Sequence, residues 1–147
     1  MRYILLFILF GILLCDYNPD AAVAYARKYC QHYNKQYGNY AKSGGDCANF
    51  VSQCLIAGGQ NLDGCVNLRT HGIIAGVTSL KNCLVKKGWK VAETKPPGFR
   101  AGYPMAYPNL KHITLATSVS GNKITYCGHT KDVCDRTLDY KVLYFYL

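Results

Sequence analysis

Apolar positions recur at helical spacing through the first two thirds of the chain. They repeat every three or four residues from position 19, which predicts a helix over residues 19–33. The apolar stretch 47–57 lies between Asp46, a residue favoured at helix N-termini, and a Gly-Gly pair, so it predicts a helix of about three turns. Residues 78–87, closed by Gly88, predict a third helix.

The C-terminal third alternates between apolar and polar residues instead. Residues 112–119 alternate with period two, a polar turn follows, and residues 124–130 return as a second strand, which predicts an antiparallel hairpin. Residues 141–147 predict a third strand and residues 89–92 a short one. Helices followed by strands are typical of an α+β fold. The sequence has no internal repeat, and we expect a single domain.

The hairpin turn determines which side chains share a face. The predicted register pairs Ser120 with Lys123. Continued along both strands, it places His129 opposite Thr114, and His112 shares a face with Thr114 because side chains alternate along a strand. The two imidazoles are therefore expected on one face as diagonal neighbours, roughly 6–8 Å apart. A slip of one residue would place them on opposite faces.

The first fifteen residues have the pattern of a secretory signal. A short basic segment precedes an unbroken apolar run over residues 4–14, which is too short to span a bilayer. We predict a signal peptide over residues 1–15 and a secreted domain over residues 16–147. Cys15 is either the last residue of the signal or a lipid-modified first residue, and the large Leu14 before it favours plain secretion.

Cysteine parity points to one free thiol. The chain holds eight cysteines, so removal of Cys15 leaves seven, and an odd member stays unpaired in an oxidising compartment. Cys47 begins the second predicted helix and lies roughly 10 Å from Cys54 along it, beyond disulfide reach. The other six are enough for three disulfides: Cys30, Cys54, Cys65, Cys83, Cys127 and Cys134.

The pairing of these six cannot be read from the sequence, although two pairs, Cys127–Cys134 and Cys65–Cys83, are close along the chain. No two cysteines stand at the C-x₂-C spacing of zinc sites. We therefore expect neither a metal nor a cofactor.

The chain is strongly basic. It has 17 Lys and Arg against 8 Asp and Glu, which gives a net charge of +9. Such an excess attracts anionic cell surfaces. No nucleic-acid-binding motif is present, so we predict no nucleic-acid partner, and we expect a monomer.

Cys47 is the candidate for covalent chemistry. It lies in the first turn of its predicted helix, where unpaired N–H groups and the helix dipole favour the thiolate, the nucleophile of cysteine hydrolases. The Cys47 backbone N–H is well placed as an oxyanion donor. A second donor stays open among Tyr37, Tyr40 and Gln53. Asp46 either caps the helix or binds a substrate amine.

Three segments carry a family pattern: Ala21-Ala22-Val23-Ala24-Tyr25-Ala26, Gly44-Gly45-Asp46-Cys47-Ala48-Asn49-Phe50-Val51-Ser52-Gln53, and His112-Ile113-Thr114-Leu115-Ala116-Thr117 followed by Gly128-His129-Thr130. They resemble the putative amidase domain family, which looks like a branch of the NlpC-type, papain-like cysteine peptidases. The resemblance implies a papain-like fold, in which the nucleophile helix packs on a small antiparallel sheet that bears the base. It implies Cys47 as nucleophile, His112 as base and His129 as the residue that orients His112.

The resemblance also implies amide bonds of bacterial peptidoglycan or muropeptides as substrate. The sequence thus predicts a secreted cysteine amidase or endopeptidase. Two alternatives stay open: a catalytically inactive, disulfide-stabilised cell-wall binding protein, and an acyl or peptidyl transferase that resolves the same thioester with an amine or alcohol.

Overall fold

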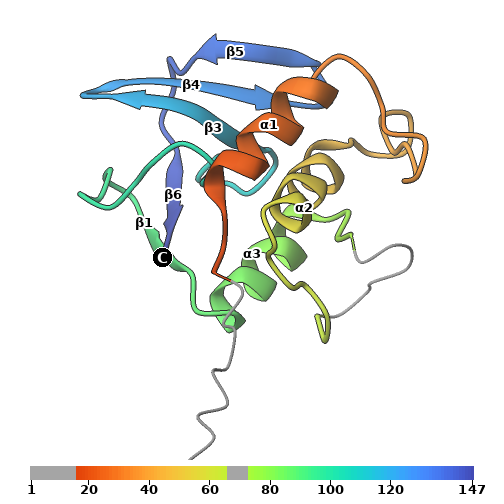
Figure 1. The fold of residues 1–147 in the computed structure, drawn as a ribbon, viewed down its shortest axis with the longest axis horizontal. Helices are drawn as coiled ribbons and strands as arrows, with labels where there is room; N and C mark the ends of the chain where they lie inside the picture. Colours follow the sequence, from red (N-terminus) through yellow and green to blue (C-terminus); the bar gives the residue numbers. More distant parts are fainter. Residues whose placement is uncertain (1–15, 66–72) are drawn as a thin grey trace, which may run out of the picture.

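The computed structural model describes residues 16–65 and 73–147, which form an α+β fold. The predicted signal peptide, residues 1–15, lies outside the described residues. Three helices precede a six-stranded sheet (Figure 1), namely α1 (Pro19–Tyr29), α2 (Cys47–Ala57), α3 (Val77–Lys86), β1 (Lys90–Ala92), β2 (Pro104–Ala106), β3 (Ile113–Ser120), β4 (Lys123–Gly128), β5 (Val133–Thr137) and β6 (Leu143–Tyr146). No helix in these described ranges is long and apolar enough to cross a membrane.

All three predicted helices are present, and α2 has the predicted bounds. Helix α1 starts with Pro19 in its first turn, and the Asn18 side chain accepts a hydrogen bond from the Ala21 N–H at 3.1 Å. The predicted end of α1 is wrong, because the helix stops at Tyr29. The Tyr29 carbonyl bonds a histidine of the sheet, and Cys30 is held in a disulfide, so the chain turns away at this point.

The sheet has the order β1-β6-β2-β3-β4-β5, and every recorded strand pair is antiparallel. The sequence analysis missed β2, which has only three residues and begins with Pro104. Proline is tolerated at the first position of a strand, although it discourages a strand prediction. The analysis also missed β5, an edge strand with the polar sequence VCDRT.

A β-bulge overturns the predicted register of the hairpin. Ser120 pairs with Lys123 as predicted, but the register shifts by one residue between Ala116 and Ser118, so that Leu115 pairs with Cys127. Continued past this pair, the shifted register places Gly128, and not His129, opposite Thr114. Consistently, a Cβ added to Gly128 would lie 3.0 Å from a Thr114 methyl group.

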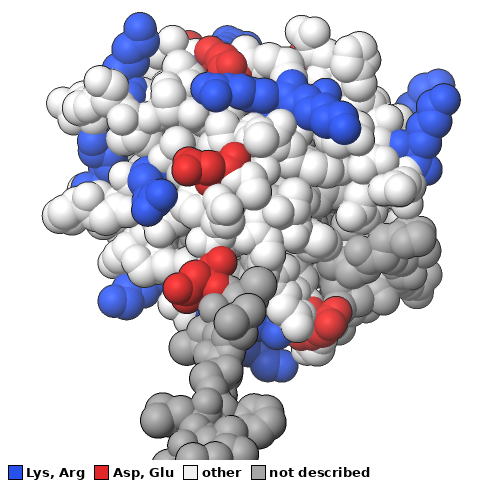
Figure 2. Space-filling model, in the orientation of Figure 1, with Lys and Arg blue, Asp and Glu red and all other residues white. Residues whose placement is uncertain are grey.

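Helices α1 and α2 pack on one face of the sheet, across β3 and β4 (Figure 1). This helix-facing side buries Phe50 and Leu115 completely. Gly102 lets the N-terminal segment approach the sheet, since its φ is +87° and an added Cβ would lie 2.4 Å from Pro19. Basic side chains on the face shown in Figure 2 are scattered, with acidic ones between them, and form no continuous basic surface there.

Two disulfides are present in the described part of the chain, not three. The suggested Cys65–Cys83 pair is confirmed, whereas the suggested Cys127–Cys134 pair is wrong. Cys134 bonds Cys30 at the end of α1, with the two Cα atoms 5.4 Å apart. Three buried cysteines are free: Cys47, Cys54 and Cys127.

Thiol labelling tests this pairing. In the unreduced protein expressed from the full chain, alkylation in denaturant should modify Cys47, Cys54 and Cys127 and leave the four bridged cysteines unmodified. Under native conditions Cys47 should react first, because it is 7% exposed and the other two are 0% exposed. Peptide mapping by mass spectrometry gives the answer, and a third disulfide joining Cys54 to Cys127 would contradict the structure.

Candidate functional site

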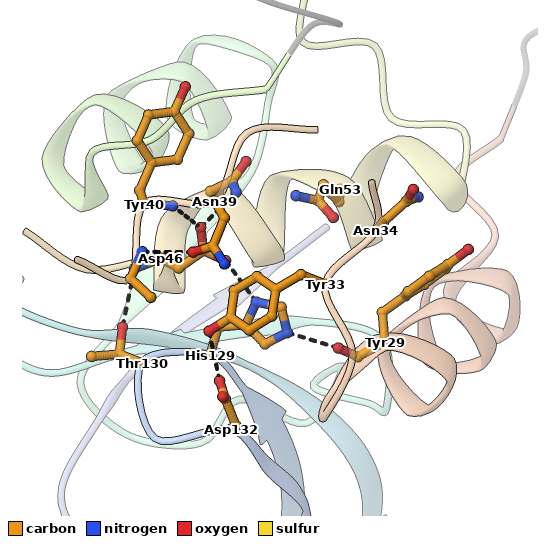
Figure 3. Close-up of polar contacts among 12 residues, drawn as sticks. Tyr29, Tyr33, Asn34, Asn39, Tyr40, Asp46, Gln53, His129, Thr130 and Asp132 are labelled. Atoms are coloured by element: carbon orange, nitrogen blue, oxygen red, sulfur yellow. Dashed lines mark hydrogen bonds and ion pairs between the residues drawn. The ribbon is translucent and has the colours of Figure 1, made fainter. Parts of the chain in front are cut away.

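The loop before α2 is shaped by two glycines. Gly44 and Gly45 have φ values of +104° and +111°, a region that side-chain-bearing residues rarely adopt. Gly45 also lies close to the end of β4, since an added Cβ would be 3.3 Å from the Thr130 hydroxyl. That hydroxyl accepts a hydrogen bond from the Asp46 N–H at 3.1 Å (Figure 3). The loop therefore holds the start of α2 against the sheet.

Asp46 precedes α2, but its carboxylate does not cap the helix. Oδ1 accepts hydrogen bonds from the Tyr40 backbone N–H at 2.8 Å and from the Asn49 side-chain amide at 2.7 Å, while Oδ2 lies 2.6 Å from Nδ1 of His129 (Figure 3). The residue is 0% exposed. A substrate amine therefore has no access to the carboxylate in this conformation, and the geometry gives the predicted amine-binding role no support.

His129 lies between two helices at the end of β4 and is 1% exposed. Its Nε2 lies 2.7 Å from the Tyr29 carbonyl oxygen, while Nδ1 contacts Asp46. Both ring nitrogens are therefore occupied by fixed oxygen atoms. The rings of Phe50 and Tyr33 lie on it at centroid distances of 4.0 and 4.3 Å.

The His129 ring is enclosed on every side by parts of the fold. The negative end of α1 is directed at Nε2, the carboxylate of Asp46 at Nδ1, and the aromatic faces cover the ring. Tyr33 is itself fixed by a hydrogen bond from its hydroxyl to Asp132 at 2.9 Å. Sequence analysis missed Tyr29 and Tyr33 as partners, because nothing in their spacing points to the ring of His129.

Cys47 is the first residue of α2 and a free cysteine. Cys54, in the C-terminal half of α2, lies near Cys127 of β4. Phe50, one turn closer to the N-terminus of α2, stacks on His129, which follows β4. Cys47, one turn further, therefore lies at the end of the sheet where β3 begins. Within the described ranges, no hydrogen bond joins its thiol to either imidazole.

His112 immediately precedes β3, at the same end of the sheet, and the shifted register puts it on the opposite strand face from His129, although both residues line one cavity there. A Cβ added to Gly128, which follows Cys127 in β4, would lie 3.9 Å from Nε2 of His112. The prediction that the two imidazoles share a face is therefore wrong, and the cause is the bulge in β3. His129 uses both ring nitrogens elsewhere and makes no hydrogen bond to His112.

The environment of His112 favours its neutral form. The side chain is half-buried and contacts the ring of Tyr107 edge-on at 5.2 Å. Burial, and secondarily the positive charge of Lys131, lowers the pKa of His112 below its ordinary value of 6.5. The ring can therefore accept a proton at neutral pH. The catalytic roles of Cys47, His112 and His129 stay predictions.

Gln53 is one of the three candidates for the second oxyanion donor. Gln53 is buried, and its side-chain oxygen accepts a hydrogen bond from the Tyr25 hydroxyl at 2.8 Å, almost two helical turns from Cys47.

The sulfurs of Cys30, Cys127 and Cys134 lie within 4.8 Å of one another. Because Cys30 and Cys134 are bonded together, only the Cys127 thiol of this trio is left as a ligand.

The buried pair predicts a large loss of stability when its charge is removed. Asp46→Asn should lower the free energy of unfolding by about 3 kcal/mol, because it leaves the ring of His129 without its counterion. The matched control is Asp135→Asn, which disrupts the half-exposed ion pair with Arg27 and should cost under about 1 kcal/mol. Urea denaturation measures both, and equal small losses would show that the Asp46 pair does not organise the fold.

The comparison with protein families finds a match. A family model described as a putative amidase domain matches residues 16–98, more than half of the 147-residue chain, and covers α1, α2 and α3. No curated protein and no solved structure matches the chain. The name of the family indicates amide hydrolysis in general. On this match, the chain belongs to the putative amidase domain family.

Proposed function

We propose that the protein is a secreted cysteine hydrolase that cleaves an amide bond in bacterial cell-wall peptides, with Cys47 as nucleophile. One observation carries the proposal: a free thiol stands at the first residue of α2, and the loop before it is held by a buried ion pair. A helix N-terminus favours the thiolate, and a fixed loop keeps its position constant.

The chemistry follows the usual course of a thiolate acting on an amide. His112 takes the thiol proton of Cys47 as the sulfur bonds to the carbonyl carbon, and the imidazolium so formed gives that proton to the amine as the C–N bond breaks, which leaves a thioester. Water then attacks the thioester, the C–S bond breaks, and the carboxylic acid is released with the thiol restored. The backbone N–H at the start of α2 is directed at the developing oxyanion.

His112 is the proposed base. It lies at the same end of the sheet as Cys47, and its lowered pKa keeps the ring neutral and able to accept a proton at pH 7. His129 has no free ring nitrogen, so we assign it with Asp46 to positioning α2 and not to proton transfer. The proposal requires the Cys47 thiol and the His112 ring to meet around the bound substrate; in the described ranges no hydrogen bond joins them.

Charge and redox state support the proposed location and substrate. Two disulfides are consistent with an extracellular protein. A net charge of +9 favours association with anionic bacterial walls. The resemblance of the Cys47 motif to wall-peptide amidases supports the same substrate class.

A cell-wall binding protein without catalysis is the second candidate. It is favoured by the small exposure of Cys47, 7%, and by the absence of a hydrogen bond from its thiol to an imidazole in the described ranges. The two candidates differ in whether removal of the Cys47 sulfur changes activity.

Digestion of purified peptidoglycan fragments tests the proposal. The unreduced protein should release fragments whose masses identify the cleaved bond, and Cys47→Ala should lower the rate by at least about a thousandfold because it removes the nucleophile. Cys54→Ala is the matched control, since it removes a free thiol from the same helix and should keep activity. Retained cleavage in a folded Cys47→Ala protein would eliminate the mechanism, and no cleavage by any form would favour the binding protein. Masses higher by an added amine or alcohol would indicate transfer instead of hydrolysis.

The pH dependence of cleavage tests the base. Because the neutral imidazole accepts the proton, kcat/KM should fall as the pH drops through the lowered pKa of His112, below about 6.5. Lys131→Gln removes a nearby positive charge, which should raise that pKa and shift the acidic limb to higher pH. Lys123→Gln, an exposed change at the β3–β4 turn, should leave the profile in place. If the acidic limb of kcat/KM stays at the same pH in Lys131→Gln, His112 is not the base.

A further inference from the structure

A small cavity of about 180 Å³ opens beside His112. The side chains that matter for its chemistry are Tyr107, His112, Tyr126, Lys131, Arg136 and Tyr140. We propose that this cavity is a subsite that binds a carboxylate group of the peptide substrate, next to the proposed base. Its assignment as a substrate subsite rests on the proposed function, whereas carboxylate binding itself does not require Cys47.

The first observation is an unsatisfied hydroxyl. The Tyr140 Oη is buried and has no hydrogen-bond partner. The side chains of Tyr126 and Thr114 lie near enough to influence the pKa of this hydroxyl. Burial raises the pKa of Tyr140 far above its ordinary value, so the hydroxyl keeps its proton and can donate it. A buried donor without a partner is costly to maintain, and an oxyanion in the cavity would satisfy it.

The second observation is the charge of the lining. Lys131 and Arg136 are cationic, Asp139 is anionic, and the lowered pKa of His112 leaves that ring neutral, while His129, which also lines the cavity, is bonded to the Asp46 carboxylate. Two cations and one carboxylate leave a single net positive charge. A carboxylate balances this charge, whereas a phosphate dianion would leave an excess of negative charge beside Asp139. Arginine is also suited to a carboxylate by the planar geometry of its N–H groups.

The third observation is the shape of the surrounding surface. Tyr140 stands edge-on between the rings of Tyr107 and Tyr126, with centroid distances of 4.8 and 5.8 Å, and these rings form walls of the cavity. Tyr140 also lines two larger hollows of about 350 and 1030 Å³, the larger of which extends to Tyr144 and Val91. The small cavity therefore neighbours a longer concave surface, where a terminal or side-chain carboxylate can bind while the rest of a peptide extends away.

Acidic peptides are therefore the expected substrate class. If His112 accepts the proton during attack by Cys47, a carboxylate bound beside His112 lies close to the scissile amide. The substrate would then carry its acidic group near the bond that is cut. An uncharged peptide of the same length would lose this contact and bind more weakly.

Binding of a small acid and its amide tests the proposal without turnover. The probes are N-acetyl-alanine and N-acetyl-alaninamide, titrated into the protein expressed from the full chain, with the His112 ring resonances followed by NMR. The acid should shift these resonances and bind at least about tenfold more tightly than the amide, because only the acid carries the charge. Inorganic phosphate, at matched ionic strength, should bind more weakly than the acid.

The variants separate the cavity from general charge effects. Arg136→Gln should weaken binding of the acid about tenfold because it removes the cationic guanidinium, and Tyr140→Phe should weaken it severalfold because it removes one hydroxyl donor. Lys123→Gln removes the same charge outside the cavity and should leave affinity unchanged. Equal binding of acid and amide, tighter binding of phosphate, or an Arg136→Gln protein with unchanged affinity would overturn the proposal.

The same titration in Cys47→Ala distinguishes this inference from the proposed function. Acid binding should be unchanged in that variant, because the cavity does not include Cys47. Binding without any peptide cleavage would leave the subsite standing and remove the hydrolase. Peptide cleavage without selective binding of the acid would support the hydrolase and exclude the carboxylate subsite.

Discussion

A buried ion pair between Asp46 and His129 joins the three parts of the molecule on which the candidate site depends. Asp46 belongs to the loop before α2, His129 directly follows β4, and Tyr29 is the last residue of α1. A charge inside a protein is tolerated only when its partners are fixed, so each of these segments constrains the other two. Cys47 follows Asp46 directly, and its position is therefore set by an interaction in which its own thiol takes no part.

The two faces of the sheet carry different groups of reactive side chains. Its helix-facing side holds the ion pair, the Cys30–Cys134 disulfide and the free thiols of Cys54 and Cys127, all withdrawn from solvent. Burial raises the pKa of the two inner thiols, which keeps them protonated and unreactive. The opposite side carries His112 and the tyrosine-lined cavity with its cationic residues. Cys47 lies at the start of α2 and is 7% exposed.

A histidine next to a cysteine motif need not be a catalytic base. His129 stands in the family-like segment Gly128-His129-Thr130, yet both its nitrogens are bound and its faces are covered. His112 keeps an accessible ring with a lowered pKa. In this chain one imidazole joins three segments of the fold, and the other is the one to which we assign proton transfer in the proposed mechanism.

Local sequence was sufficient for the features that depend on near neighbours. The bounds of α2, the β3–β4 turn, the Cys65–Cys83 pair and the α+β class follow from spacing, turn residues and period. The short strand β2, the polar edge strand β5, the Cys30–Cys134 bridge and the bulge in β3 were decided by contacts between distant segments. One bulged residue sends two histidines to opposite faces, because side chains alternate along a strand and any shift of one position reverses them. The sequence by itself thus determined the nucleophile candidate and its helix, whereas only the tertiary structure decided the partners of each histidine.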